Sequence, residues 1–191
     1  MRHRKRGRVL GRSPSHRKAL FHSMATALFL TERDATDEPN APKIKGRIVT
    51  TMPKAKEIRP LIERCVSIAK RVLNAQDDAE QYATTAERNT EAWRAWRKGS
   101  EWVKWAQAIA PVVNARRRAL RLLGDKQAVR ILFDDIAPRF RERAGGYTRI
   151  VRLAGVRLGD AGQKVILEFV GVRDRAAQTS VAPTIESGAA K

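Results

Sequence analysis

The sequence predicts an α/β (α+β) fold: a compact domain of helices packed on a small sheet, with a C-terminal β-hairpin, an extended basic N-terminal arm and an inserted tryptophan-rich helical hairpin. Three observations predict it. Apolar residues recur with helical spacing over much of the chain, and residues 164–170 alternate as in a half-buried strand. The stretch 1–23 carries many basic side chains and no acid. The length of 191 residues suffices for one domain with its own core.

The charge balance predicts a polyanionic partner. The chain has 39 Lys and Arg against 20 Asp and Glu, a net charge of +19, which would repel itself in an isolated compact domain. Nucleic acid fits best, since the chain has no apolar run long enough to span a membrane and no dominant basic amphipathic helix. The basic N-terminus also lacks the apolar stretch of a secretion signal. A single cysteine, Cys65, excludes a disulfide framework and a cysteine-based zinc finger.

Residues 1–14 are predicted to form an arm that becomes ordered on its partner, because they are basic and have few apolar side chains. A disordered basic tail or a targeting peptide is the alternative. The Ser13-Pro14-Ser15 sequence is typical of a helix start. The helix that follows has an apolar face that repeats with helical spacing, made by Phe21, Met24, Ala25 and Leu28.

The domain itself is predicted to span 15–175. An acidic, proline-containing stretch over 31–43 indicates a surface loop, and β-branched residues over 44–51 indicate a short edge strand or an extended linker. Pro53 opens the next helix, whose apolar stripe includes Cys65 as a core thiol. Pro60 lies inside that stripe, so the first turn should be kinked or set apart.

An inserted helical hairpin is predicted over 74–113. It holds all four tryptophans, with a break at Gly99-Ser100 and a second helix that ends at Pro111. Two interpretations stay open for the tryptophans. Their rings close a small core of the hairpin itself, or they form a docking surface for a neighbouring protein or for stacked bases.

The remainder of the chain closes the domain. An arginine cluster at 116–118 is followed by a short helix whose apolar face is Val129, Leu132, Phe133 and Ile136. Strands are expected over 147–154 and 164–170, joined by a glycine-rich turn. The small, polar residues 176–191 are expected to be a disordered tail.

No catalytic or metal-binding pattern is present, so the sequence predicts neither an enzyme nor a cofactor or metal site. The three histidines lie near the N-terminus, and His16 and His22 do not converge on one helix face. The pair Asp134-Asp135 points in two directions on a helix and is expected to be solvent-exposed. There is no phosphate-binding glycine loop after a strand.

Three long motifs then occur in order: MRHRKRGRVLGRSPSHRKALFHSMATALF, TTMPKAKEIR and LFDDIAPRFRERAGGYTRIVRL. With their surroundings, 1–30, 44–73 and 114–171, they resemble the family of the seventeenth protein of the bacterial large ribosomal subunit. The resemblance implies a structural, cytoplasmic ribosomal protein that binds 23S rRNA near the exit of the peptide tunnel, beside other large-subunit proteins. It implies no small-molecule substrate. Loop 31–43, hairpin 74–113 and the tail are additions to the family pattern.

The candidate rRNA-binding residues combine the basic clusters with the positions that match the family motifs. They are Arg2, His3, Arg4, Lys5, Arg6, Arg8, Arg12, Ser15, His16, Arg17, Lys18, Lys54, Lys56, Arg116, Arg117, Arg118, Arg139, Arg143, Gly145, Gly146, Tyr147, Thr148 and Arg149. The basic members are expected to contact phosphates, and the two glycines to let the backbone approach RNA. Tyr147 is either a base-stacking ring or a core residue. The competing function is that of a basic protein that compacts DNA.

Overall fold

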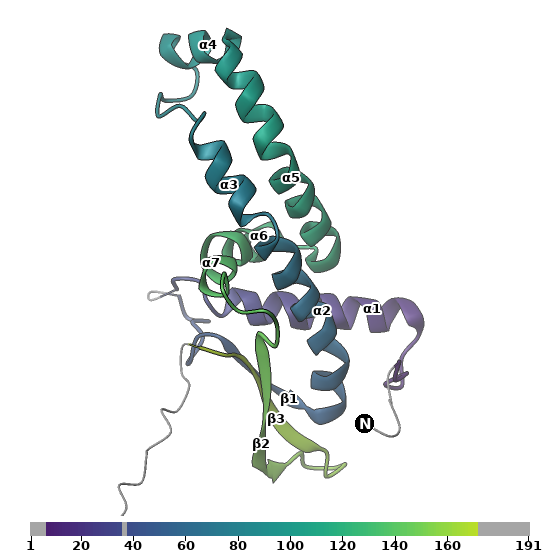
Figure 1. Cartoon of the computed structure of the whole chain (residues 1–191). Helices are drawn as coiled ribbons and strands as arrows, with labels where there is room; N and C mark the ends of the chain where they lie inside the picture. Colours follow the sequence, from purple (N-terminus) through teal and green to yellow (C-terminus); the bar gives the residue numbers. More distant parts are fainter. Residues whose placement is uncertain (1–6, 36–37, 172–191) are drawn as a thin grey trace, which may run out of the picture.

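Helices cover a small sheet, and a helical hairpin projects from them (Figure 1). The computed structural model describes residues 7–35 and 38–171. In chain order the elements are α1 (Pro14–Leu30), β1 (Arg47–Thr51), α2 (Met52–Lys70), α3 (Leu73–Glu80), α4 (Glu91–Lys98), α5 (Ser100–Leu123), α6 (Lys126–Ile131), the π-helical turn η1 (Leu132–Ile136), α7 (Ala137–Arg139), β2 (Thr148–Val156) and β3 (Gln163–Phe169). The predicted α+β class is confirmed.

The sheet is antiparallel with strand order β1-β3-β2, so β1 lies at an edge as predicted. The expected alternation in β3 is confirmed, since Val165 and Leu167 are fully buried. Neighbouring strands continue this pattern across the sheet: Leu167 pairs with Ile48 on one side and Ile150 on the other. The opposite face carries Val49, which is 63% exposed. One face of the sheet therefore packs against helices and the other faces outward.

The core lies between the sheet and the helices α1, α2, α5 and α6. Aromatic rings fill its centre: Phe29 lies 5.5 Å from Phe169, and Phe140 lies 5.1 Å from Tyr147, measured between ring centroids. Ala25 and Leu28 of the predicted α1 stripe are fully buried, whereas Phe21 and Met24 are only half-buried. The helix begins as predicted, with Pro14 in its first turn and the Ser13 hydroxyl accepting a hydrogen bond from the His16 amide.

Cys65 is a core thiol, as expected, with no exposed surface. Burial raises the pKa of its thiol to about 12, because the apolar surroundings disfavour the thiolate. We therefore expect Ellman's reagent at pH 8 to leave the folded protein essentially unlabelled and to label one thiol per chain once urea unfolds it. Stoichiometric labelling within seconds in the absence of urea would contradict this burial.

Two prolines behave differently from the prediction. Pro60 lies within one uninterrupted helix, α2, so the first turn is not set apart. Pro111 does not end α5, which continues to Leu123. The reason lies in the packing after Pro111: Val112, Ala115, Ala119 and Leu123 keep the helical apolar repeat and are all buried. Burying four further side chains outweighs the one backbone hydrogen bond that proline removes.

The predicted hairpin exists, but its first arm is shorter than expected. Helix α3 ends at Glu80 and packs against α5, and a loop over 81–90 leads to the short helix α4. Asn89 in that loop adopts a left-handed backbone conformation with φ of 74°, and the Thr90 hydroxyl caps α4. Gly99 separates α4 from α5, which confirms the break predicted at Gly99-Ser100. The arginine cluster 116–118 therefore belongs to α5 itself.

The segment from α6 through η1 to α7 confirms the predicted short helix. Val129, Leu132, Phe133 and Ile136 are all buried, and Asp134 and Asp135 are exposed, as expected. The predicted loop over 31–43 contains no helix or strand among its described residues. The expectations for the start of the arm, residues 1–6, and for the tail, residues 176–191, lie outside the described residues.

Candidate nucleic-acid interface

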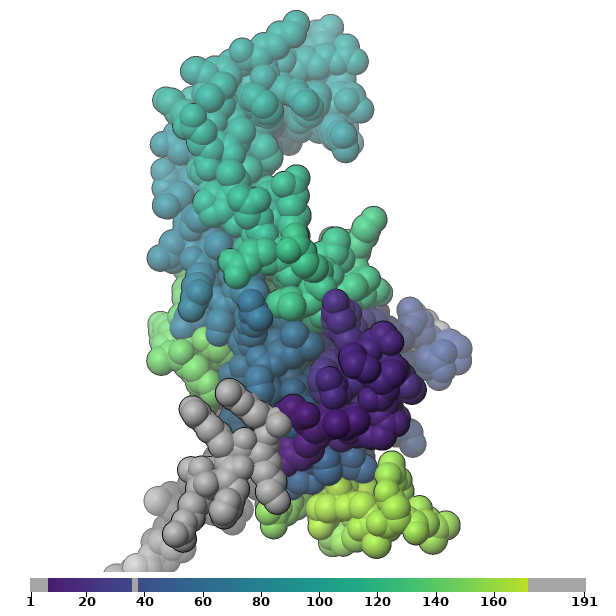
Figure 2. All heavy atoms as spheres, turned by 90° about the vertical axis from the view of Figure 1, so that its right-hand side faces the viewer, coloured from purple at the N-terminus to yellow at the C-terminus, as the bar shows by residue number. Residues whose placement is uncertain are grey.

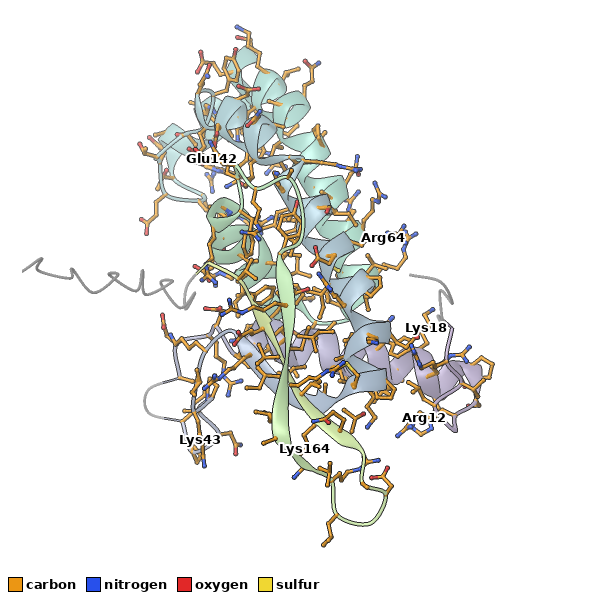
Figure 3. The ribbon with its side chains drawn as sticks, turned by 60° about the horizontal axis from the view of Figure 1, so that its bottom comes forward. Arg12, Lys18, Lys43, Arg64, Glu142 and Lys164 are labelled. Carbon is orange, nitrogen blue, oxygen red and sulfur yellow. The ribbon has the colours of Figure 1, made fainter. Side chains whose placement is uncertain are left out.

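Basic side chains gather on one side of the molecule, where three segments far apart in sequence meet. Figure 2 shows the N-terminal segment, α2 and the C-terminal half of α5 together on this side. Arg12, Lys18 and Arg64 lie on the same side in Figure 3, well away from Lys43. We use the name basic face for a set of exposed or half-buried cations that these three segments carry: Arg12, Arg17, Lys18, Lys54, Arg64, Arg117, Arg118 and Arg121.

Helix α5 supplies the densest charge of the basic face. Its stretch 114–123 contains four arginines and no acid. Arg116 is held inward, donating to the Asp134 carboxylate at 2.9 Å and lying 4.8 Å from the Phe133 ring centroid. Arg117, Arg118 and Arg121 are exposed, form no ion pair with any described residue, and fall within about 100° of one another around the helix. They present three free guanidinium groups in one direction.

The acidic side chains of α2 do not neutralise this face. Glu63 points to the other side, where its carboxylate accepts hydrogen bonds from the backbone amides of Tyr147 at 3.0 Å and Thr148 at 2.9 Å, and from the Thr148 hydroxyl at 2.7 Å. Glu57 binds the chain just before α1. Both carboxylates are therefore engaged in holding the fold together, and Arg64 stays exposed.

Glu57 anchors the described end of the N-terminal arm to α2. Its carboxylate lies 2.7 Å from Arg8 Nη1 and accepts a hydrogen bond from the Gly7 amide at 3.0 Å. We expect Glu57→Gln to lose the ion pair and free this end of the arm, so that limited trypsin digestion cleaves after Arg8 several times faster than in the unchanged chain. Glu38→Gln, which removes the more exposed pair with Arg33, is the matched control. Equal cleavage rates after Arg8 in both variants would contradict the anchoring role.

A small cavity of about 260 Å³ lies beside the arm, between the start of α2 and the β2–β3 turn. Arg12 and Lys54 line it. Arg12 Nη1 donates to the Leu10 carbonyl at 2.7 Å, while its Nε is buried without a hydrogen-bond partner among the described residues. Asp160, also at the rim, pairs with Arg157, and that hydrogen bond holds the pKa of the carboxyl well below its usual range. The cavity therefore offers two cations to an anionic group.

Other sequence-predicted candidates are engaged elsewhere in the fold. Arg139 makes two hydrogen bonds to Glu32, at 3.0 and 3.3 Å, and Arg149 Nε donates to Glu168 at 2.6 Å. Tyr147 is 3% exposed and Thr148 is 2% exposed, so of the two alternatives for Tyr147 the structure supports the core residue. Both side chains lie inside the fold, next to Glu63 and the aromatic core, and a contact of either with RNA stays a prediction.

The remaining candidates are exposed. Ser15, His16, Lys56, Arg143 and the two glycines at 145–146 lie on the surface. Gly146 has a φ of 68°, and no atom lies within 4 Å of the position that a Cβ would take. The backbone at this turn is therefore open to close approach by another molecule.

Within the described ranges 7–35 and 38–171, no group of three His, Cys, Asp or Glu side chains is placed to hold a metal ion. In the same ranges no helix has the length and apolar character needed to cross a membrane.

Comparison with known families decides the identity. The family model described as ribosomal protein L17 matches residues 20–170. This chain belongs to the ribosomal protein L17 family. A relative from Rhodopirellula baltica, named large ribosomal subunit protein bL17, is 57% identical over 189 residues, which cover 99% of this chain and 90% of the relative. Proteins of the same name from Allorhizobium ampelinum and Agrobacterium fabrum are 36% and 37% identical, covering 98% and 89% of this chain and 99% and 82% of those relatives.

Membership in the L17 family confirms the resemblance drawn from the three motifs. The chain is a structural constituent of the large ribosomal subunit and not an enzyme. The alignment with the Rhodopirellula protein covers 99% of the chain, so it runs through the projecting hairpin as well.

Sequence reasoning missed two members of the basic face. Arg64 and Arg121 were not among the candidates, although both lie opposite the apolar stripe of their helices. The position of a basic residue on the polar face of an amphipathic helix can be read from the sequence, and this signal would have identified both arginines. Which cations are neutralised was not visible, because the partners Glu32, Asp134 and Glu168 come from distant segments.

Proposed function

We propose that this L17-family chain binds 23S rRNA through the basic face and the N-terminal arm, and that it does so near the exit of the peptide tunnel, beside neighbouring large-subunit proteins. The observation that carries the proposal is the set of three exposed arginines without ion pairs to any described residue, Arg117, Arg118 and Arg121, in the C-terminal half of α5. This half of α5 lies on the same side of the molecule as the N-terminal segment and α2 (Figure 2). Guanidinium groups bind phosphate through paired hydrogen bonds, so such a set fits a site where RNA backbones converge.

The mechanism is structural. Segments of RNA backbone repel one another, and the cations of the basic face hold them together while counterions are released. A-form RNA hides the base edges of its major groove, so recognition proceeds through shape, phosphates, 2′-hydroxyls and unpaired nucleotides. The open turn at Gly145-Gly146 lets the backbone come close to RNA, and the basic residues of the arm, Arg2 to Arg6 included, add further cations for phosphates.

Sucrose-gradient fractionation of a cell lysate tests the proposal, with the chain followed by mass spectrometry at moderate and then high salt. An rRNA-bound constituent is expected to migrate with the large subunit and to stay there at salt that removes loosely bound basic proteins. Migration at the top of the gradient would contradict rRNA binding, and migration with DNA would favour the DNA-compacting alternative.

The position near the tunnel exit needs a separate measurement. A stalled nascent chain that carries a photo-crosslinker just outside the ribosome is expected to cross-link to this protein. The same crosslinker placed deep inside the tunnel serves as the control and should not reach it. Absence of the cross-link at every emerged length would contradict the proposed position.

A further inference from the structure

The far end of the hairpin holds a second candidate site, well away from the basic face (Figure 1). We call residues 81–105 the tip. A cavity of about 410 Å³ opens there, lined by all four tryptophans of the chain together with Arg88 and Arg97 and by no carboxylate. Helix α5 joins the tip to the body, and its 24 residues span about 36 Å at 1.5 Å per residue. The tip and the basic face are therefore too far apart to form one binding site for a small ligand.

The tryptophans form two pairs with different tasks. Trp96 and Trp105 pack edge-to-face with ring centroids 5.6 Å apart, and Trp96 Nε1 donates to the Tyr82 carbonyl at 3.1 Å. This pair closes the hairpin, as one of the two interpretations of the sequence expected. Trp93 and Trp102 instead flank Arg97, whose guanidinium carbon lies 5.0 and 5.7 Å from their ring centroids. None of the four rings is fully buried, and α4 contains no buried residue.

The charge of the tip fits an anion. Its five cations, Arg88, Arg94, Arg97, Lys98 and Lys104, form no ion pair with any described residue. The acids Glu87, Glu91 and Glu101 lie outside the cavity lining. Flat aromatic surfaces beside unpaired arginines are the combination with which proteins hold single-stranded nucleic acid: bases stack on the rings and cations hold the phosphates.

We propose that the tip binds unpaired nucleotides of RNA, with a base stacked against Trp93 or Trp102 and the adjoining phosphates held by Arg88 and Arg97. A duplex is the wrong shape, because its bases are already stacked and cannot enter the cavity. A basic ribosomal neighbour is disfavoured, because the cavity presents two arginines and no carboxylate. This inference rests on the proposed function in one respect only, namely that the chain is bound to rRNA.

Tryptophan fluorescence of the full-length chain tests the proposal directly, since every tryptophan lies in the tip. The probe is a ten-nucleotide single-stranded RNA of mixed A and U with a fluorescent end label, titrated at moderate salt. Stacking quenches tryptophan emission, whereas binding to the basic face leaves it unchanged. We expect saturable quenching by the single strand, and little quenching by an RNA duplex of the same composition.

Substitutions then separate the tip from the basic face. Trp93→Ala should weaken the quenching interaction roughly 5- to 100-fold, the usual cost of losing one stacking ring. The double variant Arg88→Gln/Arg97→Gln keeps all four tryptophans and should also weaken the quenching interaction. It tests whether Trp93→Ala acts only by disrupting the local fold. Gln substitutions at Arg117, Arg118 and Arg121 should leave the quenching curve unchanged while weakening binding of 23S rRNA.

The outcomes distinguish the two proposals. Anisotropy of the end label that reports RNA binding without tryptophan quenching would overturn the tip site and leave the basic face standing. Quenching with unchanged affinity in both tip variants would also overturn it. In purified large subunits, ultraviolet irradiation should cross-link the tip peptide to rRNA, and a tip cross-linked to protein alone would show that the tip docks a neighbouring protein instead.

Discussion

Replacing Arg117, Arg118 and Arg121 together with glutamine is expected to weaken the binding of 23S rRNA by a factor on the order of 10² near physiological salt. Each phosphate contact contributes about 0.7–0.9 to the slope of log K against log salt, so the slope should fall by about two to three units. Glutamine keeps the high helix propensity of α5, and the three side chains are exposed, so the free energy of unfolding should hardly change. Filter binding of a 23S rRNA transcript at several KCl concentrations measures the slope.

The matched control removes the same charge elsewhere. Lys43, Arg152 and Lys164 are exposed cations of the loop and the sheet, and none of them belongs to α5. Lys43 lies well away from Arg12, Lys18 and Arg64 in Figure 3. Glutamine at these three positions should reduce the slope much less than the α5 variant does. If both triple variants lose equal affinity and equal slope, binding depends on net charge and the basic face has no special role.

Glu63→Ala is expected to cost about 3–5 kcal/mol of unfolding free energy. The carboxylate is the acceptor for the amides of Tyr147 and Thr148 and for the Thr148 hydroxyl, and both residues are almost completely buried. Alanine leaves these donors without a partner in a place that water does not reach easily, at about 1–3 kcal/mol for each unsatisfied group. Urea denaturation, followed by circular dichroism, measures the loss.

Two companion variants show where the effect arises. Glu63→Gln keeps one acceptor oxygen and should recover part of the lost stability. Arg59→Ala removes only the 3.8 Å ion pair of a half-exposed side chain with Glu63, and should cost less than about 1 kcal/mol. A loss below 1 kcal/mol in Glu63→Ala itself would mean that the start of β2 does not depend on this carboxylate.

The elements that the sequence predicted well are those with a long apolar repeat. The alternation in β3 and the stripe of α2 are set by burial on one face, and the predicted α1 stripe is buried at Ala25 and Leu28. The prediction failed where a local signal competed with packing. Pro111 is a breaker by itself, yet Val112 and Ala115 continue the buried stripe beyond it. Conversely, the residues over 81–90 are compatible with a helix, but Thr90 caps a new one after the left-handed Asn89.

The sequence predicted which basic residues belong to the candidate site, but it did not predict which of them form ion pairs within the fold. Residue type and motif placed basic clusters in the arm, on α2 and on α5. Whether a given arginine is free depends on long-range pairing: Arg139 meets Glu32 from 107 positions away, while Arg117 meets no described acid. For Tyr147 the sequence left two roles open, and the burial of its ring against Phe140 favours the core.

The uninterrupted course of α5 through Pro111 couples the orientation of the tip to that of the basic face. A single rod carries Arg117 near one end and Trp102 near the other, so each residue added between them would rotate the tip by about 100° and advance it by about 1.5 Å. Only insertions close to a whole number of helical turns preserve the direction in which the tip cavity faces. Seven residues would lengthen the hairpin by about 10 Å and turn the cavity by only about 20°. Homologous hairpins of different length should therefore vary in steps of about two turns, with α3 extended to match.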